Sequence, residues 1–471
     1  MIFQIQLHFK IKKKRYRNSM AAKKVTSKNC EERLPKCVYR NDPVLIKPMS
    51  ETPKHILRLS DVDDQTFLRF SIKCVLVYRE SIEAEWLKFC LSRVLVDYYP
   101  LAGRLRGCPM DPQKLEVDCN GEGALFAEAF VDLNSHNFLS FCSKPTNSAF
   151  WTKTTLLFKP KLLDPLDFPP LSLQVTYLRC GGMIVTAAIN HCLCDGIGTS
   201  QFLHAWAHIS SQSNLPPPLN PPFHSRHVLS HHQHPTKIPP FPLPQYTKTP
   251  RPNWHLDITK SLQSHPLLIP SSTIFTQSQI LLLKPSSNCT TFETLASHTW
   301  RSWIRSLDLP PSLHVKLLFS VNIRNKLSPK IPHGYYGNAI VLGCAQSSVN
   351  ELTLAHDLTP VVRLVQNAKS IVDDDYVKSM IFLLKDKSLQ ADLSATFVIS
   401  DWTKLGLQDL DFGSGKPLEM SPLASDVFCL FLPVIGDVKA VRVLVSLPAN
   451  VVEKFEYYMT GEWFPDRETN V

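Results

Sequence analysis

The pattern of apolar and polar positions in the first half of the chain predicts strands and helices in mixed order. Residues 72–78 alternate as a half-buried strand does, and residues 82–96 carry apolar positions at helical spacing. Pro100 follows this helix and predicts its end. Short apolar runs at 37–39 and 44–46 predict two small strands before it. Together these segments indicate an α/β arrangement.

A further apolar run leads directly to residues with chemically active side chains. Residues 183–189 are small or β-branched and follow Gly181 and Gly182, so we predict a buried strand there. Residues 198–207 have the pattern of a helix. The turn between this strand and this helix is therefore a place where side chains can be presented to a substrate.

The second half of the chain repeats this mixed pattern. Residues 274–283 predict a strand, and Thr290 predicts the start of a helix that Glu293 supports. Later apolar runs predict strands at 317–324, 339–342 and 395–399 and a helix at 355–372. We therefore expect an α/β fold of two similar domains, each a mixed sheet with helices.

The composition changes abruptly between the two halves. Prolines recur between residues 211 and 252 too often for a regular helix or a central strand. A chain of 471 residues is long for one core, and two domains of roughly 200 residues are the expected arrangement. We therefore predict a basic extension at 1–35, domains at 36–210 and 253–465, and a solvated crossover linker at 211–252.

The turn after the 183–189 strand places His191 and Asp195 four residues apart, next to Gly196. The unperturbed pKa of imidazole lies near neutrality, so a histidine held at a strand end can take a proton from an alcohol or an amine. Asp195 would orient the imidazole or shape the turn. Because this spacing also occurs by chance, a purely structural role for both residues remains an alternative.

Three other motifs accompany this turn in a fixed order. The run YPLAGRL at 99–105 precedes it, and YGN at 336–338 and DFGSGKP at 411–417 follow it. Together they resemble the BAHD family of plant acyl-CoA-dependent acyltransferases, whose signatures are His-x-x-x-Asp-Gly in mid-chain and Asp-Phe-Gly-Trp-Gly near the C-terminus. The resemblance covers the chain from Val38 to Gly461.

The resemblance implies a fold and a mechanism. The fold would be two chloramphenicol-acetyltransferase-like domains with an active-site channel at their interface. Acyl-CoA would enter as a co-substrate, with no permanently bound cofactor and no metal, and His191 would be the general base. Ser400 and Trp402 would donate to the oxyanion of the tetrahedral intermediate, a contribution that is often the largest in catalysis. A structural role for these two residues is the alternative.

The resemblance also implies which residues support the site. Arg324 would form an ion pair with Asp195 and turn that carboxylate away from the substrate, so that Asp195 shapes the turn rather than polarising the imidazole. Breaking such a buried pair would leave an uncompensated charge.

The late motif would support the fold and the coenzyme side of the channel. Asp411, Gly413 and Gly415 match the family pattern, whereas Ser414 replaces the usual tryptophan. This change affects the rigidity of the loop more than catalysis. Asn190 likewise replaces a frequent histidine at a position that the mechanism does not require.

Two groups of residues suggest chemistry other than general-base catalysis by His191. Cys192 and Cys194 flank the histidine and suggest an acyl-enzyme nucleophile, but small buried cysteines are common core residues and we expect both to pack. A histidine cluster in the proline-rich segment suggests metal binding, but a metal site needs a scaffold, so a solvated linker is favoured. This cluster consists of His231, His232 and His234.

Composition and charge narrow the class of protein. No stretch approaches about 18 uninterrupted apolar residues, so we predict no transmembrane helix. The 13 cysteines lack regular spacing, which favours reduced thiols in a cytosolic protein.

The net charge of +10 is concentrated before Glu31, and Met20 is an alternative start. We expect a solvated extension there and no nucleic-acid partner, although a basic segment also favours an anionic membrane surface, such as that of the endoplasmic reticulum. Nothing in the sequence indicates oligomerisation, so a monomer is expected.

The sequence indicates the acceptor substrate only through the branch of the family that the chain resembles. The segments 416–422, 427–433 and 438–447 are most similar to the cuticle-associated branch of the family, the defective in cuticular ridges type. This similarity implies acylation of hydroxy fatty acids or acylglycerols in cutin assembly. Hydroxycinnamoyl transfer to a fatty alcohol, a shikimate-type alcohol or an amine is the alternative. A further alternative is a non-catalytic partner of a fatty-acid elongation enzyme.

Overall fold

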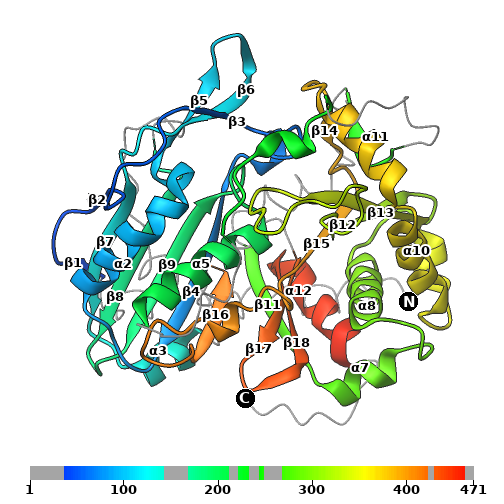
Figure 1. Ribbon diagram of the computed structural model, residues 1–471. Helices are drawn as coiled ribbons and strands as arrows, with labels where there is room; N and C mark the ends of the chain where they lie inside the picture. The colour runs from blue at the N-terminus through cyan, green and yellow to red at the C-terminus, as the bar shows by residue number, and fades with distance from the viewer. Residues whose placement is uncertain are drawn as a thin grey trace, which may run out of the picture.

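The computed structural model describes residues 37–142, 168–211, 221–232, 243–248, 268–422 and 429–461. In these parts the chain forms two halves that lie side by side, each with one large mixed sheet (Figure 1). The predicted α/β fold with two sheet-and-helix halves is confirmed. The basic extension predicted at 1–35 lies outside the described residues.

The N-terminal half contains a seven-stranded sheet in the order β1-β7-β8-β9-β4-β16, with β2 also paired to β7. Helices α2 and α5 pack against one another and share its core. A separate three-stranded sheet has the order β3-β6-β5. The elements are β1 (Val38–Tyr39), β2 (Val44–Ile46), β3 (Ile56–Arg58), η1 (Thr66–Leu68), β4 (Ser71–Tyr78), α2 (Ala84–Asp97), η2 (Tyr99–Ala102), β5 (Arg104–Cys108), β6 (Asp111–Asp118), β7 (Ala124–Val131), α3 (Ser135–Cys142), β8 (Leu171–Leu178), β9 (Met183–Asn190), α5 (Gly196–Ser210) and β16 (Glu419–Pro422).

The C-terminal half contains a six-stranded sheet in the order β11-β18-β17-β15-β12-β13, with helices packed against it (Figure 1). A two-stranded pair, β10-β14, forms a separate sheet whose Tyr246 and Ala391 pack against the six-stranded sheet. The elements are η4 (Arg226–Leu229), β10 (Tyr246–Thr247), β11 (Leu268–Phe275), α7 (Gln277–Leu283), α8 (Thr291–Ser306), β12 (His314–Asn322), β13 (Ile340–Ser348), α9 (Val349–Leu354), α10 (Thr359–Ser370), α11 (Asp374–Leu384), β14 (Gln390–Ala391), β15 (Thr396–Asp401), η6 (Leu407–Asp409), β17 (Cys429–Val434), β18 (Asp437–Pro448), α12 (Ala449–Glu456) and η7 (Tyr457–Gly461).

Most predicted elements are present, for local reasons. The strand predicted at 183–189 is β9, which lies between β4 and β8. Both its faces are covered, since Val185 packs in the main core of this half and Ile184 in a second cluster on the opposite face, so its sequence does not alternate. Helix α2 ends at Asp97, and Pro100 lies in the short 3-10 helix that follows. Thr290 caps α8 with Glu293 in the expected reciprocal arrangement.

One predicted strand is wrong at its C-terminal end. The strand β11 stops at Phe275, and the apolar run up to Leu283 forms the helix α7 instead. Thr276 accepts from the backbone N–H of Gln279, whose side chain accepts in return from the N–H of Thr276. This capping box starts a helix in which only Ile280 and Leu283 are buried, at helical spacing.

The two halves are joined more closely than the sequence suggests. Strand β16 comes from the second half of the chain but pairs with β4 of the seven-stranded sheet, with Met420 opposite Leu76. The expected solvated character of the linker is wrong where the linker is described at η4, because Arg226 is 1% exposed and Leu229 is 0% exposed. The linker therefore contributes to the packing between the halves.

Candidate active site

His191 lies at the C-terminal end of the buried strand β9, where the chain turns. Its backbone N–H donates to the carbonyl of Phe70 at 2.7 Å, and the edge of the Phe70 ring meets the imidazole with centroids 5.2 Å apart. Asn190 closes the turn, because its side-chain oxygen accepts from the N–H of Cys192 at 3.0 Å. His191 as a whole residue is partly buried, and its Nδ1 is fully buried.

Asp195 ends the turn and begins α5. Its Oδ1 accepts from the backbone N–H of Gly198 at 2.8 Å, which makes Asp195 the N-cap of the helix. A Cβ at Gly198 would lie 1.8 Å from the carbonyl oxygen of Tyr336, so glycine is required for this close approach. The helix start is thereby pressed against the second half of the chain.

Arg324 follows β12 and forms the expected ion pair with Asp195. Its Nη1 lies 2.8 Å from Oδ2 and its Nη2 lies 3.0 Å from Oδ1, a bidentate fork. The N–H of Ala339 also donates to Oδ2, at 3.1 Å. Burial would raise the pKa of Asp195, but Arg324 and the backbone donors lower it below its ordinary value. Asp195 thus points away from the imidazole and joins the two halves.

Asn338 lies beside His191 and was recognised in the sequence as part of the YGN motif, without a role for its side chain. Its Nδ2 donates to the carbonyl oxygen of His191 at 2.6 Å and to Asp63 Oδ1 at 2.9 Å. Asn338 Oδ1 and His191 Nδ1 are both buried without a hydrogen-bond partner. Burial lowers the pKa of His191, whereas its own backbone, Asp195, Asn338 and Asp63 act in the opposite direction.

Ser400 and Trp402 lie at the end of β15. Ser400 is paired with Leu430, which belongs to the core of the N-terminal half, so Ser400 is on the sheet face that turns toward that half. Trp402 is 9% exposed and is part of the same core as Cys192. Within the described residues, neither side chain is hydrogen-bonded to His191, and their role in oxyanion binding stays a prediction.

The two cysteines beside His191 are packed inside the protein. Cys192 and Cys194 are 0% exposed. Burial raises the pKa of Cys192 to about 12 and also raises that of Cys194. Because the thiolate is the nucleophilic form, this environment disfavours a covalent role.

The late motif forms a loop that Asp411 holds. Its Oδ1 accepts from the N–H of Gly413 at 2.7 Å and of Gly415 at 2.9 Å, and both glycines have positive φ, at 110° and 88°. Phe412 is fully buried against the Tyr78 ring. Two side chains of the N-terminal half donate to backbone carbonyls of this loop region. The loop is thus anchored without the family tryptophan.

The two histidines of the linker cluster that the structure describes, His231 and His232, contact other side chains. His231 Nδ1 lies 2.8 Å from Asp61 Oδ2, so its ring nitrogen is paired. The ring of His232 lies beside it, with centroids 4.0 Å apart. His234 is outside the described residues. Over the parts of the chain that the structure describes, no three His, Cys, Asp or Glu side chains gather as a metal site would require.

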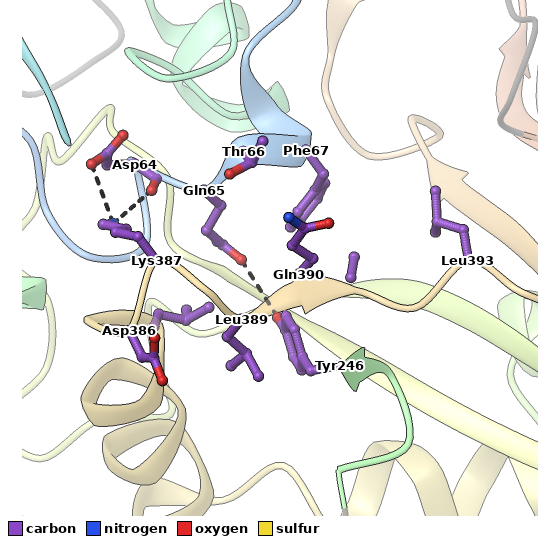
Figure 2. A pocket seen from close by; sticks show the side chains of 12 residues that line it. Asp64, Gln65, Thr66, Phe67, Tyr246, Asp386, Lys387, Leu389, Gln390 and Leu393 are labelled. Atoms are coloured by element: carbon purple, nitrogen blue, oxygen red, sulfur yellow. Dashed lines mark hydrogen bonds and ion pairs between the residues drawn. The ribbon is translucent and has the colours of Figure 1, made fainter. Parts of the chain in front are cut away.

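A pocket of about 130 Å³ lies at the junction of the two halves and the linker. Figure 2 shows Asp64, Gln65 and Phe67 from the η1 region on one side and Tyr246 and Lys387 on the other. Lys387 contacts Asp64, and Tyr246 donates to Gln65. Its η1 wall continues into the segment that contacts His191, so the pocket adjoins the catalytic turn without including the imidazole.

Comparison with known proteins identifies the group to which the chain belongs. A family model described as the Transferase family matches residues 40–461, which is most of the chain. The chain belongs to the BAHD acyltransferase family. This BAHD protein is therefore an acyltransferase that transfers groups other than amino-acyl groups, in a family that uses acyl-CoA as co-substrate.

Two relatives from Arabidopsis thaliana are similar to this BAHD protein over nearly its whole length. One, a fatty alcohol:caffeoyl-CoA acyltransferase, is 33% identical over 432 residues, which are 90% of this chain and 98% of the relative. The other, an omega-hydroxypalmitate O-feruloyl transferase, is 32% identical over 442 residues, or 89% and 92% of the two chains.

Solved structures support the fold. Vinorine synthase superposes with a TM-score of 0.69 at 20% identity, covering 91% of this chain and 98% of that one. TRI101 from F. sporotrichioides, complexed with coenzyme A and T-2, gives 0.65 at 17% identity, covering 87% and 98%. This BAHD protein thus has the two-domain, chloramphenicol-acetyltransferase-like fold that the resemblance implied. None of its described helices is long and apolar enough to span a membrane.

Proposed function

We propose that this BAHD acyltransferase transfers an acyl group from acyl-CoA to the hydroxyl of a lipid acceptor, with His191 as the general base. The observation that carries the proposal is the geometry of His191. Its Nδ1 is buried, whereas the residue as a whole is partly exposed, so we assign Nε2 as the nitrogen that meets the substrate. Asp195 is fully engaged with Arg324 and backbone donors, which leaves the imidazole as the proton acceptor.

The reaction follows from these positions. Nε2 of His191 takes the acceptor proton as the acceptor oxygen forms a bond with the thioester carbonyl carbon. We place the oxyanion of the tetrahedral intermediate near Ser400 and Trp402, as predicted from the sequence. Its collapse breaks the C–S bond and expels the thiolate of coenzyme A, to which the imidazolium returns the proton. No covalent enzyme intermediate forms, and the thioester is already activated without a metal.

The proposed acceptors are fatty alcohols and hydroxylated fatty acids of the kind used in cutin and the cuticle. The names of two relatives support this class, because one acts on a fatty alcohol and the other on ω-hydroxypalmitate. The same names favour caffeoyl-CoA and feruloyl-CoA as donors. The pocket beside the catalytic turn includes the apolar Phe67 and Leu393, and we place there the part of the acceptor beyond its hydroxyl. The predicted domain boundaries, cytosolic location and monomeric state belong to the same proposal.

A substrate panel tests the acceptor class. With caffeoyl-, feruloyl-, acetyl- and palmitoyl-CoA as donors, we expect release of coenzyme A with hexadecanol or ω-hydroxypalmitate to exceed release with shikimate or spermidine by at least about tenfold. Burial of each CH₂ contributes about 0.8 kcal/mol, so two buried methylenes account for this ratio. A thiol reagent measures the coenzyme A that is released, and mass spectrometry identifies the ester product.

Two outcomes of this panel would contradict the proposal. Release with shikimate or spermidine but with neither lipid would refute the lipid acceptor. Release with no acceptor, from protein whose folding is verified by circular dichroism, would favour the non-catalytic partner of an elongation enzyme.

The pH dependence tests the base. Because burial lowers the pKa of His191 and the base must be neutral, we expect kcat/KM to rise with pH through a group that titrates below 6.5, the ordinary value. Activity should therefore persist at mildly acidic pH and be lost only at lower pH. Circular dichroism at each pH separates acid unfolding from titration. An acidic limb centred above 6.5 would contradict this assignment.

A further inference from the structure

A buried carboxylate lies behind the His191 site, on a residue that the sequence motifs do not include. Asp63 is 0% exposed. Its Oδ2 accepts from the backbone N–H of Ser60 at 3.2 Å and from its hydroxyl at 2.8 Å. Its Oδ1 accepts from Asn338 twice, from the backbone N–H at 2.8 Å and from Nδ2 at 2.9 Å. Asp63 therefore holds Asn338 by two donors at once.

Arg226, from the linker, provides the opposite charge. Its side chain is 1% exposed, and its Nη1 lies 3.5 Å from Asp63 Oδ1. Its Nη2 donates to the carbonyl of Leu193 at 3.0 Å, inside the catalytic turn. Its guanidinium also lies over the Tyr336 ring, 4.5 Å from the centroid. A buried ion pair is costly, and removing one partner leaves an uncompensated charge, so this pair is a fixed element of the site.

The contacts of Asn338 allow only one orientation of its amide. A carboxylate can only accept, so the group that faces Asp63 must be the NH₂. The same NH₂ also donates to the carbonyl of His191 at 2.6 Å. In the reversed orientation, Oδ1 would face two acceptors. Oδ1 is therefore turned away from Asp63, and it is buried without a partner, as is Nδ1 of His191.

We propose that Asp63, neutralised by Arg226, is a positioning residue that sets the tautomer of His191 through Asn338. In the reacting enzyme Asn338 Oδ1 would accept the Nδ1–H of the imidazole, so that these two buried atoms without a partner satisfy one another and Nε2 is left unprotonated to accept the proton of the acceptor. If Asn338 were reversed, its NH₂ would face Nδ1 and select the tautomer that has no free Nε2 lone pair. This inference rests on the proposed role of His191 as the base.

The tautomer can be measured directly in the unmodified protein. We expect ¹⁵N NMR of imidazole-labelled protein, above the pKa of His191, to show Nδ1 protonated and Nε2 unprotonated. The His191 signals are identified as those missing from the His191→Gln variant. An Nε2-protonated His191 in the native enzyme would overturn the proposal, and this measurement does not depend on the folding of an Asp63 variant.

The substitution Asp63→Asn tests the same link kinetically. An amide at position 63 can donate as well as accept, so only the carbonyl of His191 still favours the native orientation of Asn338. We expect kcat to fall about 10- to 100-fold, the range known for loss of the outer partner of a metal-bound histidine, with KM for acyl-CoA within about twofold. The His191 signals should shift toward the other tautomer.

A matched control separates positioning from stability. Asp392→Asn breaks another buried pair, in which Asp392 lies 2.8 Å from Lys316 Nζ, but Asp392 is bonded to Ser394 rather than to Asn338. We expect this variant to lose stability while its kcat stays near that of the native enzyme. An unchanged kcat and tautomer in Asp63→Asn would overturn the inference while leaving the base intact. Full activity of His191→Gln would instead refute the proposed function.

Discussion

Replacing His191 with alanine is expected to lower kcat for acyl transfer by about 10²–10⁴-fold, the usual contribution of a general base. His191 lies where the two halves meet: its backbone carbonyl accepts from Asn338, and its Nδ1 is buried, which leaves Nε2 as the proposed base. Asp195 cannot take over as base, because both its oxygens are bonded to Arg324 and backbone donors. Free coenzyme A, measured under saturating donor and acceptor, reports the loss.

The controls for this variant separate chemistry from packing. His191→Gln keeps most of the side-chain volume and should lose as much activity as His191→Ala. His204→Gln changes another partly buried histidine, on α5, whose Nε2 lies 3.0 Å from the carbonyl oxygen of Gly406. We expect kcat of this control to remain within about twofold of the native value, as is usual for a change outside the reacting groups. Retention of native turnover by His191→Ala would refute general-base catalysis.

Replacing Arg324 with leucine is expected to lower the free energy of unfolding by about 3–5 kcal/mol, because it leaves the Asp195 carboxylate buried without its counter-charge. Asp195 is 2% exposed, and Arg324 also donates to the carbonyl of Gly337 at 3.0 Å. The ion pair joins the start of α5 to the second half of the chain, so both halves should lose stability. Chemical denaturation followed by circular dichroism measures the change.

Two comparisons sharpen this prediction. The double variant Arg324→Leu with Asp195→Asn removes the orphaned charge and should recover part of the loss. Lys454→Leu breaks an exposed pair with Asp308 inside the C-terminal half, in which the two side chains are 52% and 92% exposed, and should cost at most about 1 kcal/mol. Equal losses in Arg324→Leu and Lys454→Leu would mean that the burial of the Asp195 pair adds nothing to stability.

The local sequence pattern was sufficient to predict the catalytic turn and the strand that leads to it. The run before His191 is apolar without alternation because both faces of β9 are buried, and Asp195 has the short polar side chain that an N-cap requires. Pattern failed at Leu281 and Leu282, which are apolar but exposed on α7. A capping box at Thr276 and Gln279 was the available signal for that helix.

The support of the site was harder to recognise. Asp63 lies in an acidic run and Arg226 in a proline-rich segment, and neither position stands out by spacing. The glycines around Asn338 indicated a turn but not the function of its amide. A polar side chain acquires such a role only when its partners are brought to it, so no short-range pattern marks it.

The sequence by itself determined most of the predicted strands and helices, the turn that carries His191 and Asp195, and the family motifs, because each depends on neighbours only a few residues away. Only the tertiary structure decided the pairing of β16 with β4, the burial of Arg226 and the contact of Asn338 with Asp63, 275 residues earlier. These interactions join backbone and polar groups that are far apart in the chain. They form because buried donors, acceptors and charges must find partners once the two halves pack together.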